Sequence, residues 1–221
     1  MRNREPPKRP SSTIPVASTL SCLEPRRTHP EVAARDGYEI VHATFSRLQP
    51  LRAGFKAIDE HLSGINLPKI ALCGVELRSP RPLSLKDFSA FNGSYVDVLK
   101  SWGLLLDAAV NPVARTNVAP VLFPPPEPSF YGFSYTVRSA TPRKTFIVAG
   151  AGEFGDLSRN LTDIIRRGDT SQAAITEKTR YVTGVMGGKL RAMGANWPDV
   201  TTINFYAAHE LSEALQASAL V

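Results

Sequence analysis

The chain has 221 residues, of which 43% are hydrophobic and 21% are charged, a composition typical of globular proteins with one core or two small ones. No stretch approaches the ~18 consecutive apolar residues of a membrane-spanning helix, and charges and prolines occupy the N-terminus where a signal peptide would be apolar. We therefore expect a cytoplasmic protein with no membrane partner. The net charge is +6, but residues 1–30 contribute +4 of it, and the nearly balanced remainder contains no RNA- or DNA-reading motif, so no nucleic-acid partner is expected.

The cysteines and histidines form no metal-binding pattern. Two cysteines, Cys22 and Cys73, are too few for a disulfide framework or a zinc site. The four histidines are scattered, without HxH or HExxH spacing. We therefore expect neither a metal nor another cofactor.

The first half of the chain predicts a short tail followed by alternating strands and helices. Residues 1–30 hold six prolines and little apolar periodicity, so we expect residues 1–36 to be a mobile, basic, proline-rich extension. The sequence then predicts a strand over 38–45, a helix from Leu51 that stops at Gly64, and a strand over 69–77. A second helix begins at Ser84, with Asp87 three residues later in the position of a capping box.

The second half predicts further strands around one long helix. The segment "NPVARTNVAPVLFPPPEPSFYGFSYTVRSA" indicates a strand, a proline-rich loop and a second strand, in which Tyr131, Phe133, Tyr135 and Val137 alternate with smaller residues and would form one buried face. A strand over 144–150, a helix over 176–193 and a strand over 199–207 follow.

One turn pattern occurs twice, with an offset of 130 residues. The first helix ends in "SGINLPKIALCGVEL" and the last in "MGANWPDVTTINFYA", which share a G-x-N-x-P spacing. We expect the glycine to close each helix in a left-handed conformation and the proline to stop it before a strand. The pattern favours duplication and an α+β fold, in which helices pack on one face of a mostly antiparallel sheet.

The stretch "TFIVAGAGEFGD" places Gly150, Gly152 and Gly155 in a GxGxxG spacing behind an apolar run. A dinucleotide site needs a helix to begin at the third glycine and an acidic residue about 20 residues further on, whereas the strong helical pattern here starts only near Thr176. The glycines are better explained by close approach of a backbone or a ligand at the end of a strand.

Three segments between residues 51 and 138 share a pattern with a known family: "LRAGFKAIDEHLSGINLPKIALCGVEL", "FSAFNGSYVDVL" and "NPVARTNVAPVLFP". This region resembles the RidA (YjgF) family of enamine/imine deaminases. The segment from Thr145 to Gly194 looks like the family's third strand, serine-glycine turn, "GD...Q" loop and first helix. The order of these parts is displaced, which indicates a permuted domain or a tandem pair, with 37–140 and 141–221 as related parts of a 37–221 domain. The resemblance implies a RidA or chorismate-mutase-like fold and a homo-oligomer, a trimer in this family.

The resemblance also implies a site for a small carboxylate. Arg115 matches the family arginine that holds the substrate carboxylate, and Asn92 matches an asparagine that orients substrate or water. A guanidinium suits this task because its paired donors fit a carboxylate. Gly150 would line the site at the glycine corner, and Glu153 beside it is a candidate catalytic acid or base.

The chain departs from the family pattern at several positions. Thr116 and Asn117 follow the arginine where relatives carry cysteine or valine, Ala149 replaces a serine, and the strand "FYGFSYTV" lacks a glutamate. We therefore expect a specialised deaminase or hydrolase that acts on an unsaturated, carboxylate-bearing imine, enamine or amino-muconate-type intermediate. The alternative is a non-catalytic protein of the same fold that binds a small ligand or serves assembly.

Overall fold

The computed structural model describes residues 31–105, 111–140, 143–154 and 164–218, and shows an α+β fold. The expected tail over 1–30 lies outside these residues. The elements are β1 (Glu31–Ala33), β2 (Tyr38–Pro50), α2 (Leu51–Gly64), the 3-10 turn η1 (Lys69–Ala71), β3 (Leu72–Arg78), α3 (Leu85–Ser101), β4 (Ala114–Val118), β5 (Ser129–Arg138), β6 (Phe146–Val148), α4 (Gln172–Ala192), the 3-10 turn η2 (Trp197–Asp199) and α5 (Ser212–Gln216).

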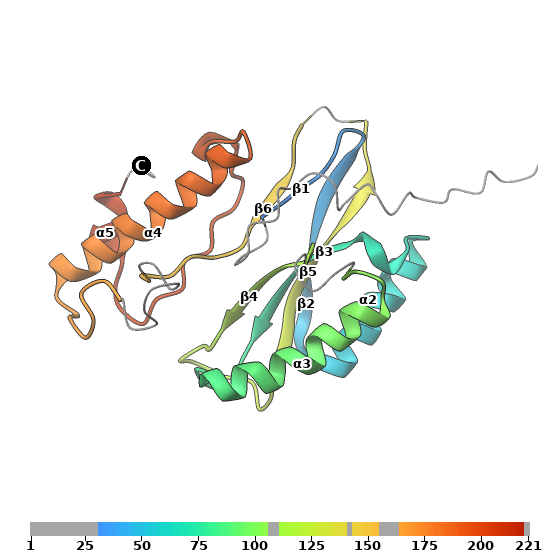
Figure 1. The fold of residues 1–221 in the computed structure, drawn as a ribbon, viewed down its shortest axis with the longest axis horizontal. Coiled ribbons are helices and arrows are strands. Elements are labelled where there is room, and N and C mark those ends of the chain that lie inside the picture. The colour runs from blue at the N-terminus through green and yellow to red at the C-terminus, as the bar shows by residue number, and fades with distance from the viewer. Residues whose placement is uncertain (1–30, 106–110, 141–142, 155–163, 219–221) are drawn as a thin grey trace, which may run out of the picture.

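The main sheet has four strands in the order β2-β5-β3-β4. β5 pairs antiparallel with both β2 and β3, while β3 and β4 are parallel, so the sheet is mixed. Figure 1 shows α2 and α3 on one face of this sheet, with α4 and α5 set apart from them. β1 and β6 form a separate two-stranded antiparallel sheet.

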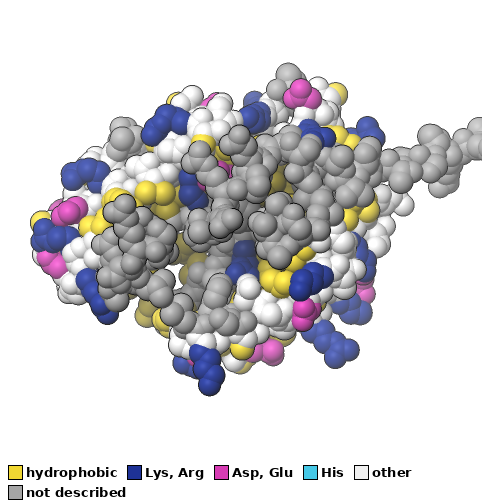
Figure 2. Space-filling model, in the orientation of Figure 1, with side chains coloured by type: hydrophobic (Ala, Val, Ile, Leu, Met, Phe, Trp, Pro, Cys, Tyr) yellow, Lys and Arg dark blue, Asp and Glu magenta, His cyan; other side chains and the backbone are white. Residues whose placement is uncertain are grey.

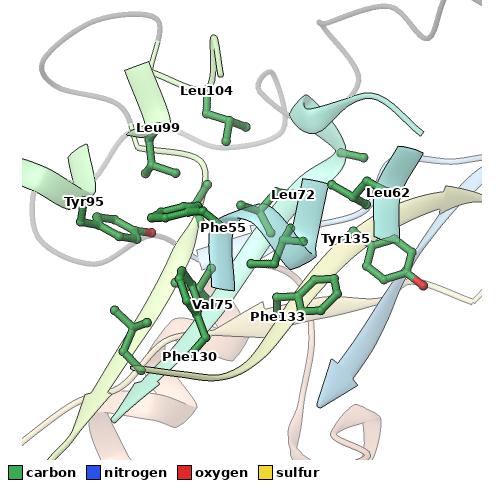
Figure 3. Close-up of a cluster of buried hydrophobic side chains, with 14 residues drawn as sticks. Phe55, Leu62, Leu72, Val75, Tyr95, Leu99, Leu104, Phe130, Phe133 and Tyr135 are labelled. Atoms are coloured by element: carbon green, nitrogen blue, oxygen red, sulfur yellow. The ribbon is translucent and has the colours of Figure 1, made fainter. Parts of the chain in front are cut away.

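The core lies between the main sheet and the pair α2 and α3. Phe55 of α2 packs against Tyr95 of α3 and Phe130 of β5, with ring centroids 5.9 and 4.9 Å away. Figure 3 shows these rings among the aliphatic side chains of both helices and of β3. Burial of this apolar surface is the main favourable contribution to folding. The core therefore holds α3 in place beside β4, where the candidate arginine lies.

The predicted helices α2 and α3 form, but α2 ends differently from the expectation. Phe55, Ile58 and Leu62 line its buried face as predicted. Ser84 caps α3 by accepting a hydrogen bond from the backbone N–H of Asp87. Gly64, however, is the last helical residue, and the left-handed residue is Asn66, with φ of 58°. The expected glycine cap is therefore wrong here, because asparagine also tolerates this conformation.

β5 is covered on both faces, whereas the sequence predicted one buried face. Phe133 and Tyr135 are buried as expected, but Ser134 and Thr136 on the opposite face are buried too. The reason is the position of β5 inside the sheet, since β6 covers part of the second face: a Cβ placed on Gly74 of the neighbouring strand would come within 2.8 Å of Ile147. The alternation of buried and exposed side chains along β5 also shifts near a bulge. As a result Phe130 is buried and Tyr131, which was predicted on the buried face, is exposed.

The described fold begins before Gly37, where the body was expected to start. Glu31–Ala33 form β1 and pair with β6, and Val32 is buried with Cys73, Ala114 and Ala149. The tail assignment for residues 31–36 is therefore wrong. A partner strand more than 100 residues away cannot be read from local composition.

The C-terminal part reproduces the expected helix and turn but lacks the expected strand. α4 begins at Gln172 with Ser171 as its cap, four residues earlier than predicted, and Gly194 takes a left-handed conformation with φ of 70°. Residues 200–207 form no strand, and Ile203, Phe205 and Tyr206 are exposed. The repeat therefore extends to the helix and the 3-10 turn alone. In the described part of the chain, no helix combines the length and apolar character needed to cross a membrane.

Candidate functional site

Arg115 is the second residue of the edge strand β4 and faces α3. Its Nη1 donates a hydrogen bond to Oδ1 of Asn92 at 2.8 Å. The guanidinium also lies over the ring of Tyr95, 4.7 Å from its centroid, and 5.9 Å from that of Phe91. The structure thus brings together two of the four residues predicted for the site. An aromatic face stabilises a nearby cation, and the amide oxygen fixes the plane of the guanidinium.

Burial changes the pKa values of Arg115 and Tyr95. It lowers the pKa of Arg115 from its ordinary value, and the nearby Tyr95 opposes that change. It raises the pKa of the Tyr95 hydroxyl, which is fully buried and has no hydrogen-bond partner among the described residues. Because an arginine starts from a pKa above 12, Arg115 stays cationic at neutral pH. Arg115 can therefore bind an anion, whereas the Tyr95 hydroxyl cannot exchange a proton near neutral pH.

A surface cavity of about 180 Å³ lies at the end of β4, and Arg115 is not among the residues that line it. Asn117, two residues after Arg115 and therefore on the same side of β4, is one of its lining residues. The others come from the end of β3, the loop before α3 and the end of β4: Ser79, Arg81, Pro82, Leu83, Val118 and Ala119. The half-buried arginine therefore lies two residues before a concave surface large enough for a small ligand.

Gly150 and Glu153 lie in a second group, against α4. The carbonyl oxygens of Ala149 and Gly150 accept hydrogen bonds from Nζ of Lys189 at 3.2 and 3.3 Å. Glu153 is half exposed, with Oε1 4.0 Å from Nζ of Lys178. A Cβ on Gly150 would meet nothing within 4 Å, so the glycine is not required there by close packing. The four predicted site residues therefore fall into two pairs, each held by a different helix.

A polar cluster on the other face of the main sheet was not predicted. Nδ1 of His42 lies 3.0 Å from Oγ of Ser134, and Nε2 lies 3.4 Å from Oε1 of Glu76. The second carboxylate oxygen of Glu76 lies 3.4 Å from Nη2 of Arg78. His42 and Glu76 sit on strands separated by β5, and they meet above Gly132, where a Cβ would lie 3.2 Å from the His42 ring. The cluster is a histidine and carboxylate pair of the kind used in proton transfer.

Sequence reasoning missed this cluster because its members are far apart in the chain and depend on strand order. The one local signal was Glu76 and Arg78, which alternate within an otherwise apolar strand.

Within the described ranges, no three His, Cys, Asp or Glu side chains gather as they would around a metal ion. On the face drawn in Figure 2, the described Lys and Arg side chains are spread over the surface and mixed with acidic ones.

Comparison with known proteins identifies the family. The family model for the 2-aminomuconate deaminase CnbZ matches residues 30–221. The chain is 39% identical over 183 residues to a 2-amino-5-chloromuconate deaminase of Comamonas testosteroni, which covers 81% of this chain and 72% of that protein. No solved structure matches the chain. The chain therefore belongs to the 2-aminomuconate deaminase CnbZ family and is an enzyme that acts on carbon–nitrogen bonds.

Proposed function

We propose that this enzyme hydrolytically deaminates a 2-aminomuconate-type substrate and that Arg115 holds the carboxylate next to the amino group. The observation that carries the proposal is the half-buried cation itself, fixed by Asn92 at 2.8 Å, two residues before the cavity-lining Asn117 on β4. The substrate class is supported by the name of the Comamonas testosteroni relative. Hydrolysis adds water across the carbon–nitrogen unit, breaks the C–N bond and releases ammonia and the corresponding oxo or enol acid.

Arg115 would act by binding and orientation. A planar guanidinium can donate two parallel hydrogen bonds to a carboxylate, which fixes the plane of a conjugated substrate as well as its position. The contact with Asn92 uses one nitrogen and sets the direction of the others. The rings of Tyr95 and Phe91 shield the cation from water, so that its attraction for an anion is stronger than at an open surface.

The reaction also needs a group that carries protons to the substrate carbon and to the leaving ammonia. Arg115 stays charged and Asn92 does not titrate, so this group lies elsewhere. We keep Glu153 as the proposed acid or base, because its carboxylate is half exposed, although it lies against α4, in a different group from Arg115. The unpredicted His42 and Glu76 pair lies on the face of the main sheet opposite Arg115, so Glu153→Gln should lose activity while Glu76→Gln retains it.

We also propose that the chain has a RidA-like fold and assembles as a homo-oligomer, with a trimer as the expected form. The sequence resemblance over 51–138 and the α+β arrangement of α2, α3 and the main sheet support the first part. Large exposed apolar side chains support the second, namely Val121, Leu122, Phe123, Ile203 and Phe205. Light scattering coupled to size-exclusion chromatography tests the assembly, and a monomer at micromolar concentration would contradict it.

The proposed function is tested by measuring ammonia release from 2-aminomuconate by the wild type and by Arg115→Met. We expect kcat/KM of the variant to fall by about a hundredfold, since losing a shielded charge-assisted contact costs about 3 kcal/mol. An exposed arginine on α4, Arg180, offers the matched control, and Arg180→Met should retain wild-type activity. Unchanged turnover in Arg115→Met would rule out the anchor. Binding of muconate without any ammonia release would favour the non-catalytic alternative.

A further inference from the structure

A muconate-type substrate carries two carboxylates, and Arg115 accounts for one of them. The inference that follows rests on the proposed function, because it concerns the far end of the same substrate. We propose that Arg81, which lines the cavity at the end of β4 together with Asn117, binds the distal carboxylate and so makes the enzyme selective for dicarboxylates.

The spacing along β4 suits such a ligand. Arg115 and Asn117 point to the same side of the strand and are separated by about 6.6 Å, two residues of an extended chain. The carboxylate carbons of an extended six-carbon dicarboxylate are about 6 Å apart, from five carbon–carbon bonds in a zigzag. Because Asn117 lines the cavity, a substrate held at one end by Arg115 extends into the space that Arg81 borders.

The charge of the cavity suits an anion. Arg81 is the cationic residue among those that line it, and none of the lining residues is acidic. Ser79 and Asn117 add neutral groups that can donate hydrogen bonds, while Pro82, Leu83, Val118 and Ala119 offer apolar contacts for a hydrocarbon chain. An anionic group entering this end of the site meets the positive charge of Arg81, which the Asp87 carboxylate 3.3 Å away offsets in part.

Arg81 is also held in place by its sequence. It lies at a bend of the chain between Pro80 and Pro82, which restrict the backbone on both sides of Arg81. Its Nη2 lies 3.3 Å from Oδ2 of Asp87 in the first turn of α3. This contact engages one nitrogen of the guanidinium and limits the directions that the side chain can take. A prearranged side chain loses less entropy when a ligand binds.

The test compares two unreactive analogues that differ at the distal end alone: trans,trans-muconate, with a second carboxylate, and sorbate, with a methyl group in its place. Their dissociation constants are measured by calorimetry on the full chain. We expect the wild type to bind muconate about tenfold more tightly than sorbate, the effect of one charge-assisted contact at a partly exposed site. Arg81→Met should bring the two affinities to within about twofold, with the affinity for sorbate unchanged.

Further variants make the outcomes distinct. Arg81→Lys, which keeps the charge, should retain part of the preference, and Arg180→Met should retain all of it. Arg115→Met should weaken both analogues equally. If Arg81→Met keeps the wild-type preference, or if the wild type shows none, the role of Arg81 is overturned. If Arg115→Met binds both analogues normally while Arg81→Met loses the preference, the proposed anchor fails and the Arg81 site stands.

Discussion

Asn92 on α3 and Arg115 on β4 are 23 residues apart in the sequence and meet through one hydrogen bond of 2.8 Å between Oδ1 and Nη1. The bond connects the helical layer to the edge strand of the main sheet. It leaves the guanidinium in a defined plane above the ring of Tyr95, 4.7 Å from the centroid. The geometry of substrate binding in the proposed mechanism therefore depends in part on Asn92, a neutral group that orients the cation.

Replacing this amide by a carboxylate should block the site without unfolding the protein. In Asn92→Asp, the new carboxylate would form an ion pair with Arg115 and compete with the substrate. We expect KM for 2-aminomuconate to rise by about tenfold or more, while the midpoint of thermal unfolding is unchanged or higher. Steady-state kinetics and calorimetry measure the two quantities.

The comparison with Asn92→Ala separates orientation from charge. The alanine variant loses the hydrogen bond without adding a competing carboxylate, so its KM should rise less than that of Asn92→Asp. Equal KM values in the two variants would show that the charge of Arg115 is not used in binding.

The parts of the fold that local patterns determine were predicted well. The apolar stripe of α2 and the Ser84 cap of α3 depend on residues within four positions of each other, and both are present in the structure. The Arg115 and Asn92 pair came from a family resemblance in adjacent segments. The prediction failed where partners are distant, as for β1 with β6 and for His42 with Glu76. Residues 200–207 have the composition of a strand but lack a partner strand in the described part of the chain, so composition alone was misleading there.

Gly54 should be intolerant of alanine, although alanine normally favours a helix. A Cβ at this position of α2 would lie 2.2 Å from Cδ2 of Phe130, a fully buried ring. We expect Gly54→Ala to lower the free energy of unfolding by about 2 kcal/mol, because the strain of overpacking exceeds the gain in helix propensity. Urea unfolding followed by circular dichroism provides the measurement.

Gly184 of α4 provides the matched control, since it is exposed and a Cβ there would meet nothing within 4 Å. Gly184→Ala should raise the free energy of unfolding by about 0.5–1 kcal/mol. If Gly54→Ala raised the free energy of unfolding as Gly184→Ala is expected to, the close packing of α2 against Phe130 of β5 would be contradicted.

Cys73 should react with alkylating agents only when the protein opens. Its side chain is fully buried on β3, and burial raises the pKa of the thiol above its usual range. Since the thiolate is the reactive form, we expect iodoacetamide at pH 8 to modify Cys73 at least about a hundredfold more slowly in the native protein than in concentrated urea. Mass spectrometry of the peptide that contains Cys73 measures both rates, and rapid modification in the native state would contradict the burial.

The buried hydroxyl of Tyr95 should make the protein less stable at alkaline pH. Burial raises its pKa in the folded state, so above pH 10 an unfolded chain releases this proton while the folded chain retains it, and stability is lost as the pH rises. Tyr95→Phe removes this contribution together with a hydroxyl that has no partner among the described residues. We expect the variant to be about 1 kcal/mol more stable at neutral pH and to lose stability less steeply above pH 10. Urea unfolding of both proteins between pH 7 and about 11 tests this, and parallel curves would show that the hydroxyl is hydrated or bonded in the folded state.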